Sequence, residues 1–286
     1  GGSASHRLLD TVRGVQKNLY SDSTTEEQTQ NSIMSFDSDG FTLGDSNGTN
    51  QNTHTFVAWN WKAGGAAASN TDGSITSSVS ASPESGFSIV THSSNNGSYG
   101  TVGHGLSSTP ELLINKDRDA SDNWIVYTTV VDGSLDVLRL NLTNSAVNSS
   151  ATAPTSTVFE SFIQNGNDVL TLCFHSVEGY SRIGKYVGTS STAFIHTGFR
   201  PAWVLIKSSN QTRNWILFDN KRTPTNEMDG HLHPNATVTE QTGTDEIDFL
   251  SNGFNFRSGD VDTNTDAFEY IFLCFADQPF KYANAK

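Results

Sequence analysis

The sequence is poor in cysteine, in basic residues and in long apolar runs. Of its 286 residues only two are cysteines, and neither Cys173 nor Cys274 lies in a Cys-x-x-Cys or Cys-x-His arrangement. A disulfide framework is therefore not indicated. Each cysteine follows an apolar strand-like run, so we expect small buried side chains. No apolar run approaches bilayer length and no amino-terminal signal pattern is present, so membrane insertion is not predicted.

The charge balance is acidic. Lys and Arg total 17 against 30 Asp and Glu, which gives a formal net charge of -13. A phosphate backbone or an anionic membrane would be repelled, so we exclude nucleic acid and membrane surfaces as partners. The sequence has no Gly-x-Ser-x-Gly elbow, and its acidic residues sit mostly in separate turns rather than in the facing pairs that glycosidases need. We therefore predict no enzyme, no catalytic residue and no cofactor.

What the sequence does contain is an internal repeat. "GFSIVTH" from Gly86 resembles "GYSRIGKY" from Gly179, 93 residues later, and "DNWIVYT" around Trp124 resembles "RNWILFD" around Trp215, 91 residues later. "GLSSTPELLINK" resembles "GFRPAWVLIK", and "VLTLCFHSVEGYS" resembles "YIFLCFADQPFKY" in the same order. Four ordered blocks at one period predict tandem structural units of about 90 residues.

The beginning of the chain matches the back half of such a unit. "HRLLDTVRG" aligns with "WILFDNKRT", "SFDSDGFTLG" with "DFLSNGFNF", and "TFVAWNWKAGG" with the Cys-Phe strands. We therefore predict a half unit at 1–64, an Ala/Ser/Thr-rich linker at 65–85 with one edge strand near Ile75, and full units at 86–178 and 179–286. The start at Gly1-Gly2 without methionine suggests a fragment, with the front half upstream or supplied by another subunit, because exposed sheet edges are costly.

The fold class predicted from these units is all-β. Their short runs are rich in Val, Ile, Phe, Tyr, Trp and Thr and are bounded by Gly, Asn, Asp and Ser clusters, which is typical of strands joined by turns. In "AWVLIK", Trp203 and Leu205 would lie on one face of a strand, and Val204 and Ile206 on the other. Tandem antiparallel β-sandwiches of a jelly-roll-like kind would bury one face of each sheet.

Two interpretations compete for "SFDSDGFTLG". Asp37 and Asp39 before Gly40, with Asp45 nearby, resemble the opening of a calcium loop. The Asp-Gly dipeptide between strand formers is also typical of a hairpin turn. The aligned repeat has leucine in place of Asp37, and leucine cannot bind calcium. The shared requirement is therefore a turn that leads into Phe41, and the three aspartates stay weak metal candidates.

Tryptophans separate into two groups. Asn123-Trp124 and Asn214-Trp215 recur at equivalent positions, which favours a packing role in the core. Trp59 and Trp61 alternate with Asn60 and would point to one side of a strand. A pair of aromatics in an incomplete unit suggests a docking or ligand-binding surface, since exposed aromatic faces stack on sugar rings.

Taken together, the blocks resemble an uncharacterised repeat domain of long virion proteins from marine tailed bacteriophages, often found beside concanavalin-like or SPRY-like lectin modules. The resemblance covers nearly the whole chain, and it lies in "HRLLDTVRG", "SFDSDGFTLG", "VAWNWKAGG", "GFSIV", "TVGHGLSSTPELLINK", "TAPTSTVF", "CFHSVEGYSRIGKY", "TGFRPAWVLIK", "IDFLSNGF" and "FADQPFKYANAK". No catalytic residues are assigned in that family, so none carries over. The loop "HSSNNGSYG" departs from the family's Tyr-Thr-Gly-Asn-Gly turn, which makes His92, Asn96 and Tyr99 candidate ligand-binding residues.

The resemblance implies a structural component on the exterior of a virion. A tail fibre or surface projection that contacts host-surface glycans is the first expectation. A polysaccharide depolymerase of a tail projection and a purely architectural capsid or tail decoration are the alternatives. Expected partners are other virion subunits and host glycan. A homo-oligomer, with a trimer favoured weakly, is expected from analogy with fibres, although no coiled-coil heptad or collagen-like repeat specifies one.

Overall fold

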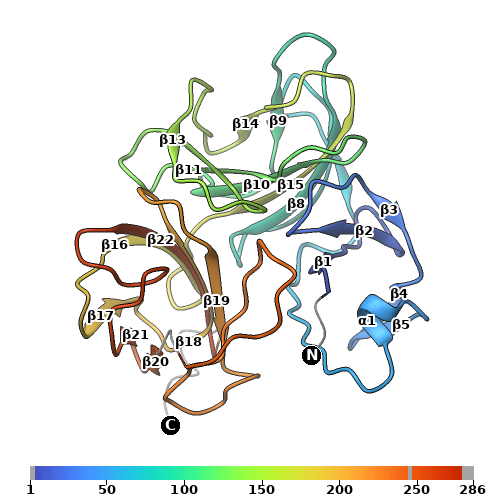
Figure 1. The fold of residues 1–286 in the computed structure, drawn as a ribbon. Coiled ribbons are helices and arrows are strands. Elements are labelled where there is room, and N and C mark those ends of the chain that lie inside the picture. The colour runs from blue at the N-terminus through green and yellow to red at the C-terminus, as the bar shows by residue number, and fades with distance from the viewer. Residues whose placement is uncertain (1–3, 244–246, 279–286) are drawn as a thin grey trace.

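Two long antiparallel sheets face each other across the middle of the molecule (Figure 1). The computed structural model describes residues 4–243 and 247–278. Within these residues the only helix is α1 (Asn47–Asn50), and no helix is long and apolar enough to cross a membrane. The prediction of an all-β fold with packed antiparallel sheets is confirmed.

The longer sheet has eight strands. Its order from edge to edge is β13-β12-β11-β10-β15-β8-β7-β6. The bounds are β13 (Val147–Asn148), β12 (Asp136–Arg139), β11 (Ile125–Thr128), β10 (Leu112–Asp117), β15 (Asp168–Phe174), β8 (Phe87–Ser93), β7 (Ser77–Ser82) and β6 (Ala68–Asn70).

The second long sheet has four strands in the order β16-β22-β18-β19. A small sheet lies on the outer face of each long sheet, β14-β9 on the first and β17-β21-β20 on the second. The bounds are β16 (Ser181–Val187), β22 (Glu269–Ala276), β18 (Pro201–Ser208), β19 (Trp215–Asp219), β9 (Thr101–Gly103), β14 (Val158–Glu160), β17 (Ala193–His196), β20 (Ile247–Leu250) and β21 (Gly253–Phe256).

Residues 4–63 form a smaller third region, drawn in blue in Figure 1. It contains a three-stranded sheet β1-β2-β3 and a two-stranded hairpin β4-β5. Residues 55–63 are not in a strand and make no backbone-to-backbone hydrogen bond among the described residues. The bounds are β1 (Arg7–Leu8), β2 (Lys17–Tyr20), β3 (Gln28–Thr29), β4 (Ile33–Phe36) and β5 (Phe41–Leu43).

Alternation along the central strands produces the layers. In β18, Trp203 and Leu205 point into a core shared by the two long sheets, whereas Val204 and Ile206 point to the small sheet behind. Side chains of a strand alternate between its two faces, so a strand between two layers is apolar on both. Burying each large apolar side chain contributes about 1.5–3 kcal/mol. The predicted alternation of "AWVLIK" is confirmed, and the shared core joins regions that were predicted as separate sandwiches.

The segment 65–85 was expected to be an extended connector with one edge strand near Ile75. It contains two strands, β6 and β7, and residues 78–82 of β7 pair with β8. In β7, Val79 points toward the small sheet β14-β9 and packs into the core there. The small polar residues on either side of Val79 point to the opposite face of the strand. Pairing with an existing sheet edge makes strands of residues with little strand propensity of their own.

The order of strands agrees between residues 86–178 and 179–278. The order β8-β15-β10-β11 in the first long sheet matches β16-β22-β18-β19 in the second. Cys173 pairs with Leu113 and Cys274 pairs with Val204, in the middle of corresponding strands. Both thiols are free and buried, and burial raises the pKa of Cys173 to about 12. The division of the chain into repeat units stays a prediction.

Candidate functional site

An open polar groove lies at the end of the eight-stranded sheet near β6. It has a volume of about 420 Å³, which is within the range of small-molecule sites. Six of its nine lining residues carry hydroxyl groups, and the other three are ionisable. The lining residues are Ser69, Thr76, Ser77, Ser78, Thr91, His92, Ser93, Arg118 and Asp168.

Strand register places the hydroxyl groups in a row. Ser69 of β6 pairs with Ser78 of β7, and Ser78 pairs with Thr91 of β8. Directly paired residues point to the same face of a sheet, so three hydroxyl side chains from three strands line the groove side by side. Two residues further along β8, on the same face, Ser93 lies opposite Asp168 of β15.

Asp168 is the accessible acceptor of the groove. Its side chain is 48% exposed, and its Oδ1 accepts a hydrogen bond of 2.6 Å from the Ser93 hydroxyl. The second oxygen, Oδ2, lies 3.6 Å from Nη1 of Arg118. A half-exposed carboxylate with a free lone pair can accept further hydrogen bonds from hydroxyl groups of a ligand.

Arg118 is held by a second region of the molecule. Its Nε and Nη2 donate to the two carboxylate oxygens of Glu27, each at 3.0 Å. Burial opposes the charge of Glu27, but Arg118 and Arg13 overcome it and lower the pKa of that carboxyl. The bidentate pair fixes the guanidinium plane, so one wall of the groove is rigid and keeps a positive charge.

His92 is at this site but faces away from it. Its ring is buried, its Nε2 lies 3.0 Å from the Ser161 hydroxyl, and its centroid lies 6.1 Å from that of Phe159 under the small sheet β14-β9. Burial lowers its pKa to about 4, so the imidazole is neutral at pH 7. The imidazole of His92 therefore does not face a ligand in the groove, and only the backbone and the edge of this residue line it.

The other two loop candidates lie just beyond β8. Asn96 is exposed and bridges to Asn165, and Tyr99 is 59% exposed. This loop leaves the sheet directly after Ser93, which belongs to the groove. Tyr99 is therefore an exposed aromatic on the same end of the sheet, although it is not among the residues that line the groove.

Trp59 and Trp61 lie elsewhere. Both pack against the core between the long sheets, and the indole of Trp61 contacts Trp203 and Phe275 with centroid distances of 5.3 and 5.6 Å. The two tryptophans do share one side of the extended segment, as predicted. That side faces the interior, so these rings are not a surface for a ligand.

The aspartates of "SFDSDGFTLG" sit in a hairpin. The Asp37 N–H donates to Gly40 O at 2.8 Å between β4 and β5, which confirms the turn. The Thr42 hydroxyl donates to Asp37, while Asp39 and Asp45 are exposed. In the described part of the chain no three His, Cys, Asp or Glu side chains are grouped to hold a metal ion.

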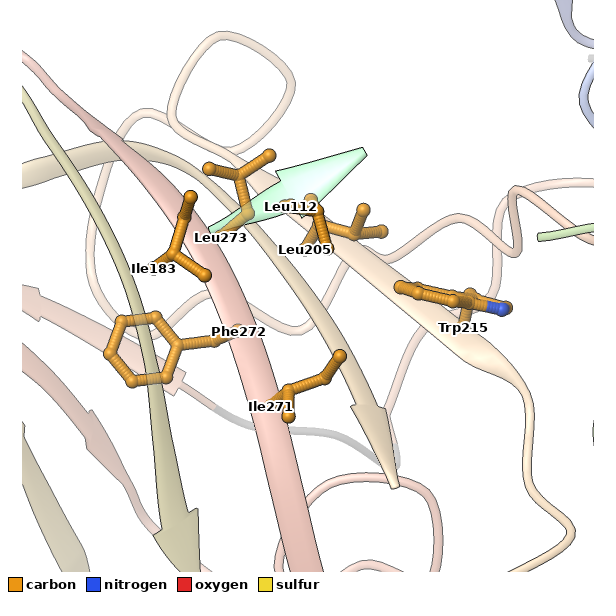
Figure 2. A pocket seen from close by; sticks show the side chains of 7 residues that line it. All are labelled: Leu112, Ile183, Leu205, Trp215, Ile271, Phe272 and Leu273. Carbon is orange, nitrogen blue, oxygen red and sulfur yellow. The ribbon is translucent and has the colours of Figure 1, made fainter. Parts of the chain in front are cut away.

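A second cavity is a packing defect of the core. Figure 2 shows the lining residues, Leu112 from β10 and the others from the four-stranded sheet; the Phe272 ring points away from the rest, into the core on the other face of that sheet. The cavity measures about 10 Å³ and its lining is apolar; the Trp215 indole N–H is already bonded to Arg139 O at 2.9 Å. A space this small without polar partners holds no ordered water, and it has no functional chemistry.

Sequence reasoning missed most of the groove. The Ser-rich stretch that contributes Ser69 and Ser78 was expected to be a linker with one edge strand near Ile75, and Asp168 was not considered. Arg118 was not considered either, although it lies in the loop directly after β10. Only the alternation of small hydroxyl residues along 76–80 could have indicated a strand with a polar face.

The fold and the groove together define the class of this protein. It is an all-β protein of stacked antiparallel sheets with an open, hydroxyl-rich groove at the end of one sheet. The chain belongs to the family described as a domain of unknown function, DUF7483, whose model matches residues 1–279. No curated protein and no solved structure matches the chain.

Proposed function

We propose that the chain is a non-enzymatic structural domain on the exterior of a virion, in a tail fibre or surface projection, and that its groove contacts host-surface glycans. The virion context rests on the sequence resemblance. The glycan part rests on the groove, and the single observation that carries it is the row of hydroxyls beside the half-exposed Asp168. Sugars present the same hydroxyl chemistry, donating to carboxylates and accepting from serine and guanidinium donors.

The arrangement supports binding more than catalysis. Among the groove residues Asp168 is the single carboxylate, whereas a glycosidase needs two carboxyl groups, about 5 to 10 Å apart. The depolymerase alternative predicts the release of reducing ends from host glycan by the purified chain. If no reducing ends are released, the proposal that the groove binds glycans is unaffected.

Adsorption competition and a glycan array test the proposal directly. The purified chain should compete with virus for host cells and should bind a subset of arrayed glycans. Asp168→Ala should weaken binding about tenfold, the effect of roughly one charged hydrogen bond. Asp39→Ala removes an equally acidic side chain from a distant exposed turn and should bind like the parent chain.

Complete lack of binding and competition would contradict the glycan part and leave an architectural decoration. That alternative predicts that Trp59 and Trp61, or the linker, are buried against a neighbouring subunit. Both tryptophans pack against the core of this chain, and Trp61 contacts Trp203 and Phe275, which weakens the reason for favouring it. Other virion subunits, and a homo-oligomer in which a trimer is weakly favoured, stay the proposed partners.

A further inference from the structure

The N-terminal region exposes apolar side chains where the C-terminal region buries them. Phe36 pairs with Phe41 across one hairpin as Phe249 pairs with Phe254 across the other. In the C-terminal hairpin both rings are fully buried, whereas Phe36 and Phe41 are only half-buried.

The same contrast holds for two neighbouring positions. Leu43 is 39% exposed and the corresponding Phe256 is 2% exposed. Phe56, on the unpaired segment 55–63, is 49% exposed, and its sequence counterpart Tyr270 is fully buried in β22. Large apolar side chains that are exposed in one region of a folded domain are typical of an interaction surface.

Three strands cover these positions in the C-terminal region. β17 pairs with β21, and β16 and β18 flank β22 on its two edges. Tyr186 of β16 stacks on Tyr270 at 5.0 Å and lies 5.4 Å from Phe256. The N-terminal region has no counterpart of these three strands among the described residues, so the outer edge of β5, the outer edge of β1 and the backbone of residues 55–63 have no partner strand there. Unpaired strand edges are costly and accept further strands.

The hairpin glycines identify where the missing strand would run. A Cβ on Gly253 would meet Ile195 O of β17 at 2.2 Å. A Cβ on Gly40, the aligned residue, would meet nothing within 4 Å. No contact within this chain therefore requires a glycine at position 40. The absence of a side chain there leaves the space that a strand of the β17 type needs.

Each region contacts the region that precedes it in the sequence, except the first region, which has no preceding region among the described residues. Trp124 Nε1 donates to Tyr20 O and Trp215 Nε1 donates to Arg139 O, so each region binds the one before it. His6 Nε2, at the position aligned with these tryptophans, lies 3.2 Å from Ala236 O of the last region, which joins the first region to the last.

Two buried lysines follow the same order. Lys116 at the end of β10 donates to Thr24 O of the first region, and Lys207 at the end of β18 donates to Thr143 O of the second. The first region has no such lysine, and the last region, where its acceptor would lie, exposes Thr237 and Val238.

We propose that the exposed face formed by β1, β4-β5 and residues 55–63 is the docking site for a front-half segment, meaning three strands of the type formed by residues 179–208 and ending in a buried lysine. The occupant to which the structure points is the polypeptide that leads into β1. In both other regions the lysine strand is joined to the next strand by a short loop, 118–124 or 209–214. This inference is independent of the glycan proposal.

An extended chain tests the docking site. A copy of residues 179–214 is fused directly ahead of His6, and the product is compared with the original chain by amide hydrogen exchange, thermal unfolding and sedimentation. The extended chain should be monomeric. It should gain exchange protection in residues 41–43 and 55–62, and its Tm should rise by on the order of 5 °C or more. A peptide of residues 179–209 added in trans should give the same protection at saturating concentration.

Two variants separate docking from general stabilisation. Gly40→Ala should leave the original chain unchanged but should abolish the gain in the extended chain, because the new Cβ would meet a β17-type carbonyl. Asp39→Ala, in the same turn, should keep the gain. Absence of new protection in the extended chain would overturn the proposal. So would protection of residues 41–43 and 55–62 in the original chain that rises with its concentration, since the occupant would then be a second copy.

Discussion

An ion-pair turn occurs twice in the molecule, once in the N-terminal region and once in the C-terminal region. In the first, Asp10 Oδ1 accepts from the Arg13 N–H and Asp10 Oδ2 accepts from Arg13 Nε. In the second, Asp219 and Arg222 make the same two bonds. In each copy the arginine also donates to a carbonyl of the preceding strand and to a glutamate, Glu27 or Glu240.

The copies differ in their surroundings. The side chain of Arg13 is fully buried and that of Glu27 is 9% exposed, whereas Arg222 is 12% and Glu240 is 43% exposed. Glu27 is buried because Arg118, from the eight-stranded sheet, closes over it. Local sequence therefore specifies the turn in both places, and the neighbouring region decides how much the ion pair contributes to stability.

The largest expected effect comes from removing the buried arginine. Arg13→Met leaves Asp10 and one side of Glu27 buried without their cation, which should lower the free energy of unfolding by about 3–5 kcal/mol. Arg222→Met should cost less, about 2–3 kcal/mol, because solvent can replace its bond to Glu240, although Asp219, whose side chain is 1% exposed, loses its cation as Asp10 does. Urea unfolding of both variants measures the difference. Equal losses would mean that the contrast in burial has no energetic consequence, and Arg13→Lys should recover part of the loss.

A buried lysine gives a second, pH-dependent comparison. Lys207 is fully buried, its Nζ donates to three carbonyls, and burial lowers its pKa to about 8. The folded pKa is below the unfolded value, so between pH 8 and about 10.4 the unfolded state binds more protons and stability rises with pH.

The gain should reach about 3 kcal/mol over that window. It is measured as the difference in unfolding free energy between the parent chain and Lys207→Met from about pH 7.5 to about pH 10, which spans most of the titration range. The variant should lack the rise. Lys116→Met should lose a pH-dependent rise of the same sign, because burial also lowers the pKa of Lys116. A parent chain whose stability falls relative to Lys207→Met as pH rises would contradict the assignment.

The structural features that could be predicted from the sequence are those that depend on a few adjacent residues. Turn chemistry around Gly40 and the two-faced alternation of residues 203–206 were predicted, because both depend on a few adjacent residues. The recurrent Asn-Trp pairs were predicted as core anchors, and Trp124 and Trp215 are buried as expected. These features need only the period of a strand or a repeated position.

The features that were missed depend on contacts across long sequence separations. Trp61 contacts Trp203 and Phe275 and Trp59 packs against the same core, so their partial burial could not be read from their own segment. The groove exists because Ser78 of an apparent linker pairs with Thr91. Neither the pairing partner nor the register is encoded in the composition of a small polar stretch.

The smallest effects distinguish the two hairpin glycines. Gly253→Ala should destabilise the chain by about 2 kcal/mol, since its Cβ would collide with the Ile195 carbonyl and force β17 to shift. Gly40→Ala should change stability by less than about 0.5 kcal/mol, the usual range for a surface substitution. Thermal unfolding of both variants in the same buffer provides the measurement. A marked loss in Gly40→Ala would mean that some part of the present chain already fills the space beside β5, and the contrast between the two regions would then no longer reflect a missing strand.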